Sequence, residues 1–273
     1  HFINNDLEFK YTQDWNGSGL VLEREVEIEQ SNLFSNYWRA GFFGKLFLPG
    51  FNDDDVFRDD NAWVYKTELL GYVGPSFSTD RRKKIIIGAD IGSGYGEKRG
   101  RGYRANLWLK AKPVEQLNIE INALQDRSPD YMQWVDIIEN PNDTIRVYAN
   151  SVLLTKDINM RLDWTFSPRL TFQCYMQPFY ANMDYKEFFR LKQPKTMDLD
   201  SYNYLGNVEN ENPDFRLFNT VGTFVLRWEY LPGSTIYLVY NLNQRSGYNF
   251  SDRVWNLEKE NAIYFKINYW LKY

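Results

Sequence analysis

Apolar and polar residues alternate through most of the chain, and the alternation is clearest in residues 153–180. Between residues 158 and 166 every second residue is apolar and those between are polar. Residues 167–169, Ser-Pro-Arg, then reverse the chain, and residues 170–177 repeat the pattern. Because successive side chains of a β-strand leave opposite faces, this stretch predicts a hairpin that is apolar on one side and polar on the other.

The two strands of this hairpin are long. An ordinary globular strand has ~5–6 residues, whereas a tilted strand needs ~9–11 residues to cross a bilayer. The length therefore favours strands of a transmembrane barrel.

The same period recurs between connections of unequal length. Besides the hairpin, we expect strands near residues 7–12, 20–29, 36–48, 63–73, 85–95, 103–110, 117–123, 215–230, 235–243 and 263–272. Connections are short near Asn32, Pro75, Pro113, Pro168 and Pro232, and longer or more irregular near Asp54, Gly100, Pro141, Pro194 and Phe250. Short periplasmic turns and longer extracellular loops alternate in this way in outer-membrane barrels. The pattern predicts an all-β, antiparallel up-and-down transmembrane β-barrel with about 12 spanning strands, as one domain over residues 1–273 that forms all or part of the barrel.

Two segments fall outside the spanning pattern. Residues 131–138 and 144–148 flank an Asn-Pro-Asn-Asp sequence, and we expect them to form a hairpin projecting from one rim. Residues 181–213 form a polar connection that is too long for a compact domain, and such loops are usually functional. We expect this connection on the extracellular side, where it carries whatever ligand recognition the protein performs. In one alternative its aromatic residues pack the loop onto the barrel rim, and in another the loop folds inward as a plug. Its candidate recognition residues are Tyr185, Phe188, Phe189, Arg190, Lys192, Lys195, Tyr202 and Tyr204.

Composition agrees with a membrane barrel. Aromatic residues make up 18% of the chain; a soluble domain could carry this content, but aromatic girdles at two membrane interfaces explain it more simply. The mean hydropathy of −0.57 fits strands that give only alternate residues to lipid. The net charge of −4 argues against nucleic acid as a partner. A soluble β-sandwich remains the alternative fold.

The chain begins with His1 instead of an initiator methionine, and no signal peptide precedes it. Because an outer-membrane protein needs such a signal, we interpret the chain as the processed form or the C-terminal part of a longer polypeptide.

Candidate catalytic chemistry is scarce. The sequence has one histidine, at its terminus, and one cysteine, so neither a Ser-His-Asp triad nor a zinc site of several His or Cys can be assembled. The aspartates Asp53, Asp54 and Asp55 lack the spacing of a calcium loop. We expect no cofactor, no metal and no enzymatic activity.

The polar faces of the strands carry many charges. If the apolar faces meet lipid, these charges point inward: Glu23, Glu25, Glu27, Glu29, Lys66, Glu68, Arg104, Lys110, Arg161, Asp163, Arg227 and Glu229. They either line a selective aqueous lumen or form cross-strand ion pairs that fill a narrow barrel. In the last strand we expect Phe265 and Ile267 on the lipid face, and Lys266 and Asn268 on the inner face.

Four segments resemble a known family. They are residues 161–168 (RLDWTFSP), 175–179 (YMQPF), 227–235 (RWEYLPGST) and 268–271 (NYWL), and Asn36-Tyr37-Trp38 also fits. They are similar to the C-terminal barrel region of the Bacteroidota family called domain of unknown function 5916. In that family the barrel usually follows a domain similar to family-9 carbohydrate-binding modules, which this sequence lacks. The resemblance implies an outer-membrane β-barrel and brings no established activity or functional residues.

Two functions follow from these expectations. The first is a transport or porin-like conduit in the bacterial outer membrane, linked to glycans through the module that relatives carry. The second is a membrane anchor or docking scaffold whose lumen is plugged and which holds a protein partner at the periplasmic or extracellular rim. The expected surroundings are the lipid bilayer and lipopolysaccharide.

Overall fold

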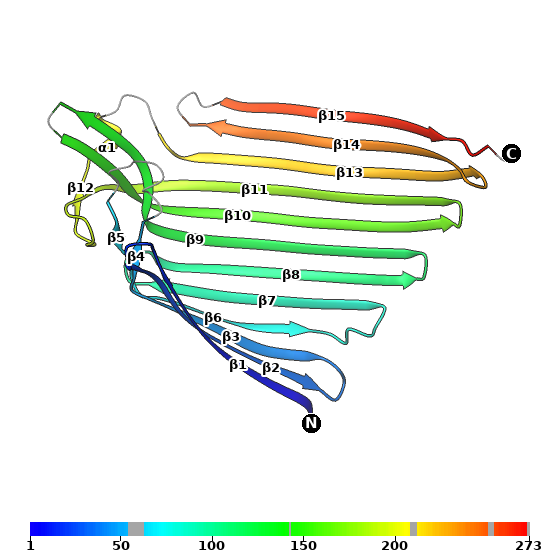
Figure 1. Ribbon diagram of the computed structural model, residues 1–273, viewed down its shortest axis with the longest axis horizontal. Helices are drawn as coiled ribbons and strands as arrows, with labels where there is room; N and C mark the ends of the chain where they lie inside the picture. Colours follow the sequence, from blue (N-terminus) through cyan, green and yellow to red (C-terminus); the bar gives the residue numbers. More distant parts are fainter. Residues whose placement is uncertain (54–62, 142, 208–211, 251–253, 272–273) are drawn as a thin grey trace.

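The computed structural model describes residues 1–53, 63–141, 143–207, 212–250 and 254–271. In these residues the chain forms a 13-stranded antiparallel sheet and a separate pair of two-residue strands. Apart from β12, the strands of the large sheet lie in sequence order, so that each pairs with its neighbours along the chain (Figure 1). They are β1 (Phe2–Trp15), β2 (Val21–Phe34), β3 (Arg39–Leu48), β6 (Leu70–Ser78), β7 (Ile85–Gly96), β8 (Gly100–Val114), β9 (Leu117–Asn140), β10 (Asp143–Ser167), β11 (Leu170–Leu191), β13 (Phe215–Leu231), β14 (Ser234–Asn249) and β15 (Val254–Asn268). This is the up-and-down arrangement of about 12 long strands that the sequence predicts.

The small elements lie at one end of the sheet. They are β4 (Phe51–Asn52), β5 (Tyr65–Lys66), β12 (Leu199–Ser201) and the single helical turn α1 (Tyr204–Asn207). Strand β12 pairs with the end of β11, and β4 pairs with β5. We call this end the loop rim. The opposite end, where β10 turns into β11 and where both termini lie, is the turn rim (Figure 1).

Both outer strands of the sheet have a free edge. Strand β1 pairs only with β2 and β15 pairs only with β14 among the described residues. The two lie on opposite sides of the view in Figure 1. The described sheet therefore remains open between β1 and β15.

The register of the central hairpin confirms the predicted faces. Met160 lies opposite Met176, Arg161 opposite Tyr175, and Leu162 opposite Cys174. Directly opposed residues of an antiparallel pair share a face, and the next residue along points to the other side. The apolar and polar rows of the two strands therefore coincide, as the period-two pattern requires.

Several predicted boundaries are wrong. Strand β6 does not end at Gly74-Pro75 but continues to Ser78, with Pro75 opposite Phe42 of β3. The ladder between β6 and β7 skips Gly74 and Pro75, which accommodates a residue without an N–H in the middle of a sheet. The connection before Gly100 is a tight turn of residues 97–99. Strand β14 continues to Asn249 and β15 begins at Val254, so both extend well into the long connection that the sequence predicts near Phe250.

The loop rim carries a compact extension of the sheet. Strands β9 and β10 pair from the Leu117–Trp164 end to the Asn140–Asp143 end, with register shifts between Val147 and Tyr148 and between Ala149 and Ser151. The expected rim hairpin is therefore a continuation of two spanning strands. Strand β11 follows β10 past the main sheet as far as Arg190. Residues 181–191 are therefore strand and not loop, which corrects the predicted connection of residues 181–213.

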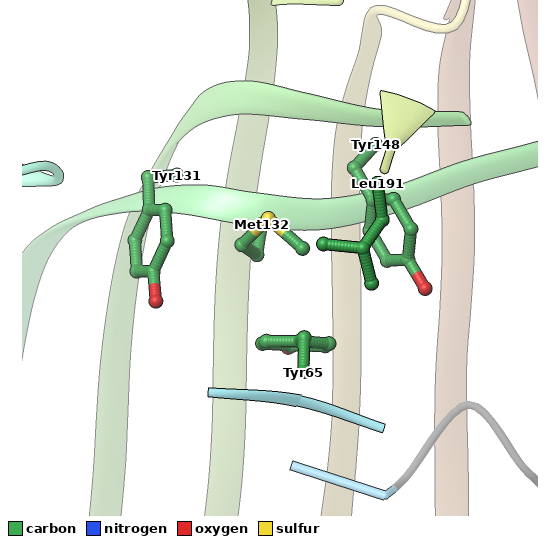
Figure 2. Close-up of a cluster of buried hydrophobic side chains, with 5 residues drawn as sticks. All are labelled: Tyr65, Tyr131, Met132, Tyr148 and Leu191. Carbon is green, nitrogen blue, oxygen red and sulfur yellow. The ribbon is translucent and has the colours of Figure 1, made fainter. Parts of the chain in front are cut away.

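Two clusters of buried side chains hold this extension together. In the first, Tyr131, Met132, Tyr148 and Leu191 of the extended strands pack on Tyr65 of β5 (Figure 2). In the second, Val147 and Ala149 of β10 pack with Phe188 and Tyr204. Because β5 belongs to the connection between β3 and β6, the first cluster links distant parts of the rim. No helix among the described residues is long and apolar enough to cross a membrane.

Candidate functional site

The polar face of the sheet brings most of the predicted inward charges together. The register places on this face Glu23, Glu25, Glu27 and Glu29 of β2, Arg104 and Lys110 of β8, Arg161 and Asp163 of β10, and Arg227 and Glu229 of β13. Lys266 of β15 lies opposite Tyr237, which lies opposite Arg227, so Lys266 also belongs to the polar face. Phe265 and Ile267 lie one residue to either side and take the apolar face.

Many of these charges form ion pairs across or along strands. Lys45 of β3 lies 2.7 Å from Glu25 and 3.0 Å from Glu27. Lys110 of β8 lies 3.7 Å from Glu120 of β9. Such pairs compensate opposite charges on neighbouring strands, although exposed pairs contribute only ~0–1 kcal/mol each. The polar face is thus charged but largely self-neutralising.

Along single strands, the same compensation joins residues two positions apart. Arg161 Nε lies 3.1 Å from Asp163 and Arg227 Nη2 lies 3.5 Å from Glu229. Gln173 of β11 donates a further hydrogen bond of 3.0 Å to Asp163. The charges of β10 and β13 are therefore held in fixed positions on the polar face.

Lys66 and Glu68 occupy a different place from the one predicted, because residues 63–69 are not a spanning strand. Lys66 lies in β5, and its carbonyl oxygen accepts a hydrogen bond of 3.0 Å from the Tyr131 hydroxyl. The buried Glu68 carboxylate accepts hydrogen bonds from the backbone N–H groups of Lys98 and Arg99, at 2.7 and 3.0 Å. It also pairs with the Arg99 side chain at 3.1 Å. Glu68 therefore closes the turn between β7 and β8.

Large side chains on the polar face lie over glycines of the neighbouring strand. A Cβ atom on Gly88 would come within 2.1 Å of the Trp108 ring, and one on Gly92 within 2.2 Å of the Tyr72 hydroxyl. The rings thus rest directly on bare backbone. Gly88 and Gly92 are thus strand positions that accommodate these rings, within the strand that the sequence predicts near residues 85–95.

A hollow opens on the polar face near the turn rim. It has a volume of about 450 Å³ and is lined from β2, β3, β6, β7 and β8 and from the turn after β6. Its lining includes Glu29, Arg39, Ser78, Asp90 and Trp108. Of these, only Glu29 is among the charges predicted to face inward. Arg39, Asp90 and Trp108 give no separate signal in the sequence beyond their place in alternating segments.

The turn rim also contains an aspartate whose carboxylate accepts several hydrogen bonds. Asp80, just past β6, accepts two side-chain hydrogen bonds of 2.9 Å from Arg82 and a backbone hydrogen bond of 3.0 Å from the Arg82 N–H. These contacts lower the pKa of Asp80 from 3.8 to about 2. The Arg82 guanidinium carbon lies 3.1 Å from the ring centre of Tyr37, in the turn between β2 and β3. One arginine therefore links two adjacent turns.

The predicted recognition residues divide into packed aromatics and exposed cations. Phe188 of β11 and Tyr204 of α1 are buried with ring centres 5.1 Å apart, and Tyr185 also stacks on Phe188 with ring centres 6.5 Å apart. The Tyr204 hydroxyl donates to Asp136 of β9 at 3.2 Å. Tyr202 packs against the same cluster, and its N–H donates to the carbonyl oxygen of Phe188 at 2.8 Å. These contacts favour the expected alternative in which aromatics pack on the rim.

The cations remain on the outside of the rim. Arg190 and Lys192 lie 3.7 and 2.9 Å from Asp200, while Lys195 is exposed with a φ of 62°. Phe189 of β11 is half-buried.

A second hollow lies among these cations. It has a volume of about 260 Å³ and includes Trp63, Arg146, Arg190 and Lys192 in its lining. Arg146 is buried, with its guanidinium carbon 5.5 Å from the centre of the Trp63 ring. Asp54 and Asp55, which the sequence suggests as acidic loop residues, lie outside the described residues.

No group of three or more His, Cys, Asp or Glu side chains in the described part of the chain is arranged to hold a metal ion.

Comparison with known proteins gives one clear match. A search of curated protein sequences finds no similar protein. Among solved structures, the chain is similar to the crystal structure of the siderophore receptor PiuA from Acinetobacter baumannii, with 8% identity, 97% of this chain covered and a TM-score of 0.49. It is also similar to the NanC porin, with 14% identity, coverage of 98% of this chain and 99% of the porin, and a TM-score of 0.24. The chain spans 46% of the length of the siderophore receptor. The model of a protein family described as domain of unknown function (DUF5916) matches residues 3–273, and the chain therefore belongs to that family.

Proposed function

We propose that the protein is a β-barrel of the bacterial outer membrane that conducts polar solutes through a charged lumen. The observation that carries this proposal is the continuous division of the sheet into two faces. One face collects charges from β2 to β15, several of them ion-paired between β2 and β13, and the other collects exposed apolar side chains such as Leu107, Phe218, Leu238 and Phe265. Rows of exposed apolar residues on long strands suit lipid, and the opposite face then borders water.

The described sheet leaves a gap between β1 and β15 that a membrane barrel has to close. In hydrocarbon, the unpaired N–H and C=O groups at the free edges of β1 and β15 each cost several kcal/mol. Strand β1 starts at the turn rim and β15 returns to it, so the two outer strands are antiparallel to each other (Figure 1). An antiparallel set that bridges them must contain an even number of strands. Because β1 and β15 lie on opposite sides of the sheet (Figure 1), we propose that further strands bridge them and that this sheet is part of a larger barrel.

A photo-crosslinking residue at Asn261 of β15 tests this closure. Adducts with a segment other than β1 support the larger barrel. Adducts with β1 would instead mean that these strands close directly on each other.

Conductance tests the conduit. The purified protein is inserted into planar bilayers and the current through single molecules is recorded. Ohmic steps whose size scales with salt concentration support an open lumen. Bilayers that stay silent, although the protein has inserted and is heat-modifiable on a gel, would refute it.

A docking scaffold is the second candidate function, and the loop rim favours it. The extension of β9, β10 and β11 has its own buried side chains, with Tyr148 and Val147 fully buried, which a simple turn between spanning strands does not require. A silent barrel that retains a bound protein during purification would support this role.

We also propose that the loop rim faces the cell exterior and that the conducted solutes include glycans. The tight turns at residues 115–116, 168–169 and 232–233 lie at the other rim, as periplasmic turns do in outer-membrane barrels. The glycan link is supported by the resemblance described above, which implies a carbohydrate-binding domain before the barrel. Biotinylation of Lys192 and Lys195 on intact cells supports the orientation, whereas protection until the outer membrane is opened contradicts it.

A further inference from the structure

We infer that the hollow near the turn rim is a binding site for an uncharged saccharide. This inference rests on the proposed function, because it places the site on the face that borders the lumen.

Two cross-strand rows build the floor and one wall of the hollow. In the first row, Arg39 of β3, Ser78 of β6, Gly88 of β7 and Trp108 of β8 lie directly opposite one another on successive strands. Three of these side chains line the hollow, while Gly88 leaves room for the indole ring to lie on the backbone. The row thus runs from a cationic side chain through a hydroxyl to an aromatic face.

The second row continues the floor with small polar groups. Ser31 of β2, Gly41 of β3, Ser76 of β6 and Asp90 of β7 are directly opposed on the same face. Three of the four residues are serine or glycine, so little fills the space above the backbone here. This absence of bulk is why a hollow of about 450 Å³ exists at this point of the sheet.

Several lining groups have unused hydrogen-bonding capacity. Among the described residues, Glu29 and Arg39 form no ion pair or side-chain hydrogen bond. The Ser78 hydroxyl is buried, with 3% of the residue exposed, and its oxygen has no hydrogen-bond partner in the described part of the chain. An unpaired buried hydroxyl is costly, and a ligand hydroxyl that reached it would remove this cost.

The charge balance of the lining decides the class of ligand. Three acidic residues, Glu27, Glu29 and Asp90, face three basic residues, Arg39, Lys45 and Arg81. An anionic ligand would be repelled by the three carboxylates, and a cationic ligand by the three basic groups. Neither charge is therefore favoured overall. Sugar hydroxyls both donate and accept, and can therefore satisfy Glu29, Arg39 and a serine at once.

The indole of Trp108 provides the apolar element of the site. A saccharide ring has an apolar C–H face as well as hydroxyl edges, and binding sites commonly combine an aromatic surface with a few convergent polar groups. The Arg81 guanidinium carbon lies over the ring, 5.9 Å from its centre, so this exposed side chain borders the space that a sugar would enter. An aromatic surface beside hydroxyls and balanced charges suits a neutral sugar better than an ion.

Calorimetry of the purified protein in detergent tests the inference without requiring conduction. The probes are four neutral tetrasaccharides, namely β-1,4-glucan, α-1,4-glucan, β-1,4-xylan and β-1,4-mannan. Acidic tetragalacturonate, a cationic chitosan tetramer and the zwitterion glycine betaine serve as comparisons. At least one neutral tetrasaccharide is expected to bind more tightly than all three charged probes.

The variants Glu29→Gln and Arg39→Gln assign the binding to this hollow. Each removes one charged hydrogen-bonding group and is expected to weaken binding about tenfold. Because neither side chain is paired, both variants should remain heat-modifiable like the parent. The control Glu260→Gln, which removes a polar-face carboxylate from distant β15, should bind as the parent does.

The outcomes separate this inference from the proposed conduit. Conductance without binding of any neutral tetrasaccharide overturns the saccharide site and leaves the conduit standing. Binding that depends on Glu29 and Arg39 in a silent barrel supports the site and refutes the conduit. Tighter binding of a charged probe, or equal loss in the Glu260 control, also overturns the inference.

Discussion

A pair of arginine substitutions at adjacent residues of β13 tests which face of the sheet meets lipid. Leu226 lies on the apolar face between Phe172 and Leu238, whereas Val225 lies on the polar face between Gln173 and Val239. Leu226→Arg and Val225→Arg introduce the same side chain one residue apart. The only large difference between them is therefore the face that receives the charge.

The depth of the site sets the expected magnitude. Leu226 lies five residues before the end of β13 at Leu231. With a rise of ~3.3 Å per residue and a strand tilt of ~40°, this distance places it about 13 Å from the turn rim. The apolar band of such barrels is ~25 Å tall, so Leu226 lies close to its middle. Arginine on the lipid face should cost ~2–4 kcal/mol there, which lowers the folding equilibrium constant roughly 30- to 1,000-fold.

The assay is urea-dependent folding of the purified variants into lipid vesicles, followed by tryptophan fluorescence and by the heat-modifiable gel band. Val225→Arg should change the free energy of unfolding by less than about 1 kcal/mol, because its side chain meets water and other polar groups. Equal costs for the two variants, or a larger cost for Val225→Arg, would refute the assignment of faces.

Three further perturbations probe the glycines, the turns and the rim. Gly88→Ala places a Cβ 2.1 Å from the indole above it, so it should destabilise the protein and shift tryptophan fluorescence, whereas Gly17→Ala meets open space and should do neither. The pKa of Asp80 is lowered from 3.8 to about 2, so its contribution to stability is full above pH 3.8 and is lost as the pH falls to about 2. Asp80→Asn should remove the part of the acid-denaturation curve that lies between these pH values. An unchanged curve would contradict this role of Asp80. Tyr204→Ala should cost the rim ~3–5 kcal/mol of local stability and expose it to protease, while Leu205→Ala, at a side chain that is 54% exposed, should leave digestion unchanged.

The alternating pattern was sufficient to predict the number of strands, their order and their faces. Arg161 and Leu162 lie on opposite faces, as the sequence predicts, because the period of two is a local property of an extended backbone. Proline and glycine were less reliable as signs of where strands end. Pro75 suggests a turn but lies inside β6, since the ladder with β7 is interrupted at that point.

The rim was harder to predict because its contacts join residues far apart in the chain. Residues 181–191 look like a polar loop, and only pairing with the extended β10 makes them a strand. The Tyr131 hydroxyl meets the carbonyl oxygen of Lys66, and the Tyr204 hydroxyl meets Asp136. Neither contact leaves a signal in the sequence near the residues concerned.

The sequence by itself determined which side chains share a face, because each strand position fixes the direction of its side chain. Only the tertiary structure decided which of these side chains are neighbours, because neighbours across the sheet depend on register and on where bulges and turns fall. Thus the sequence assigns Glu29 to the polar face, but the register alone places Arg39, Ser78 and Trp108 in one row beside it. The burial of Phe188 against Tyr204 likewise depends on how a distant connection folds back on the rim, which no local pattern encodes.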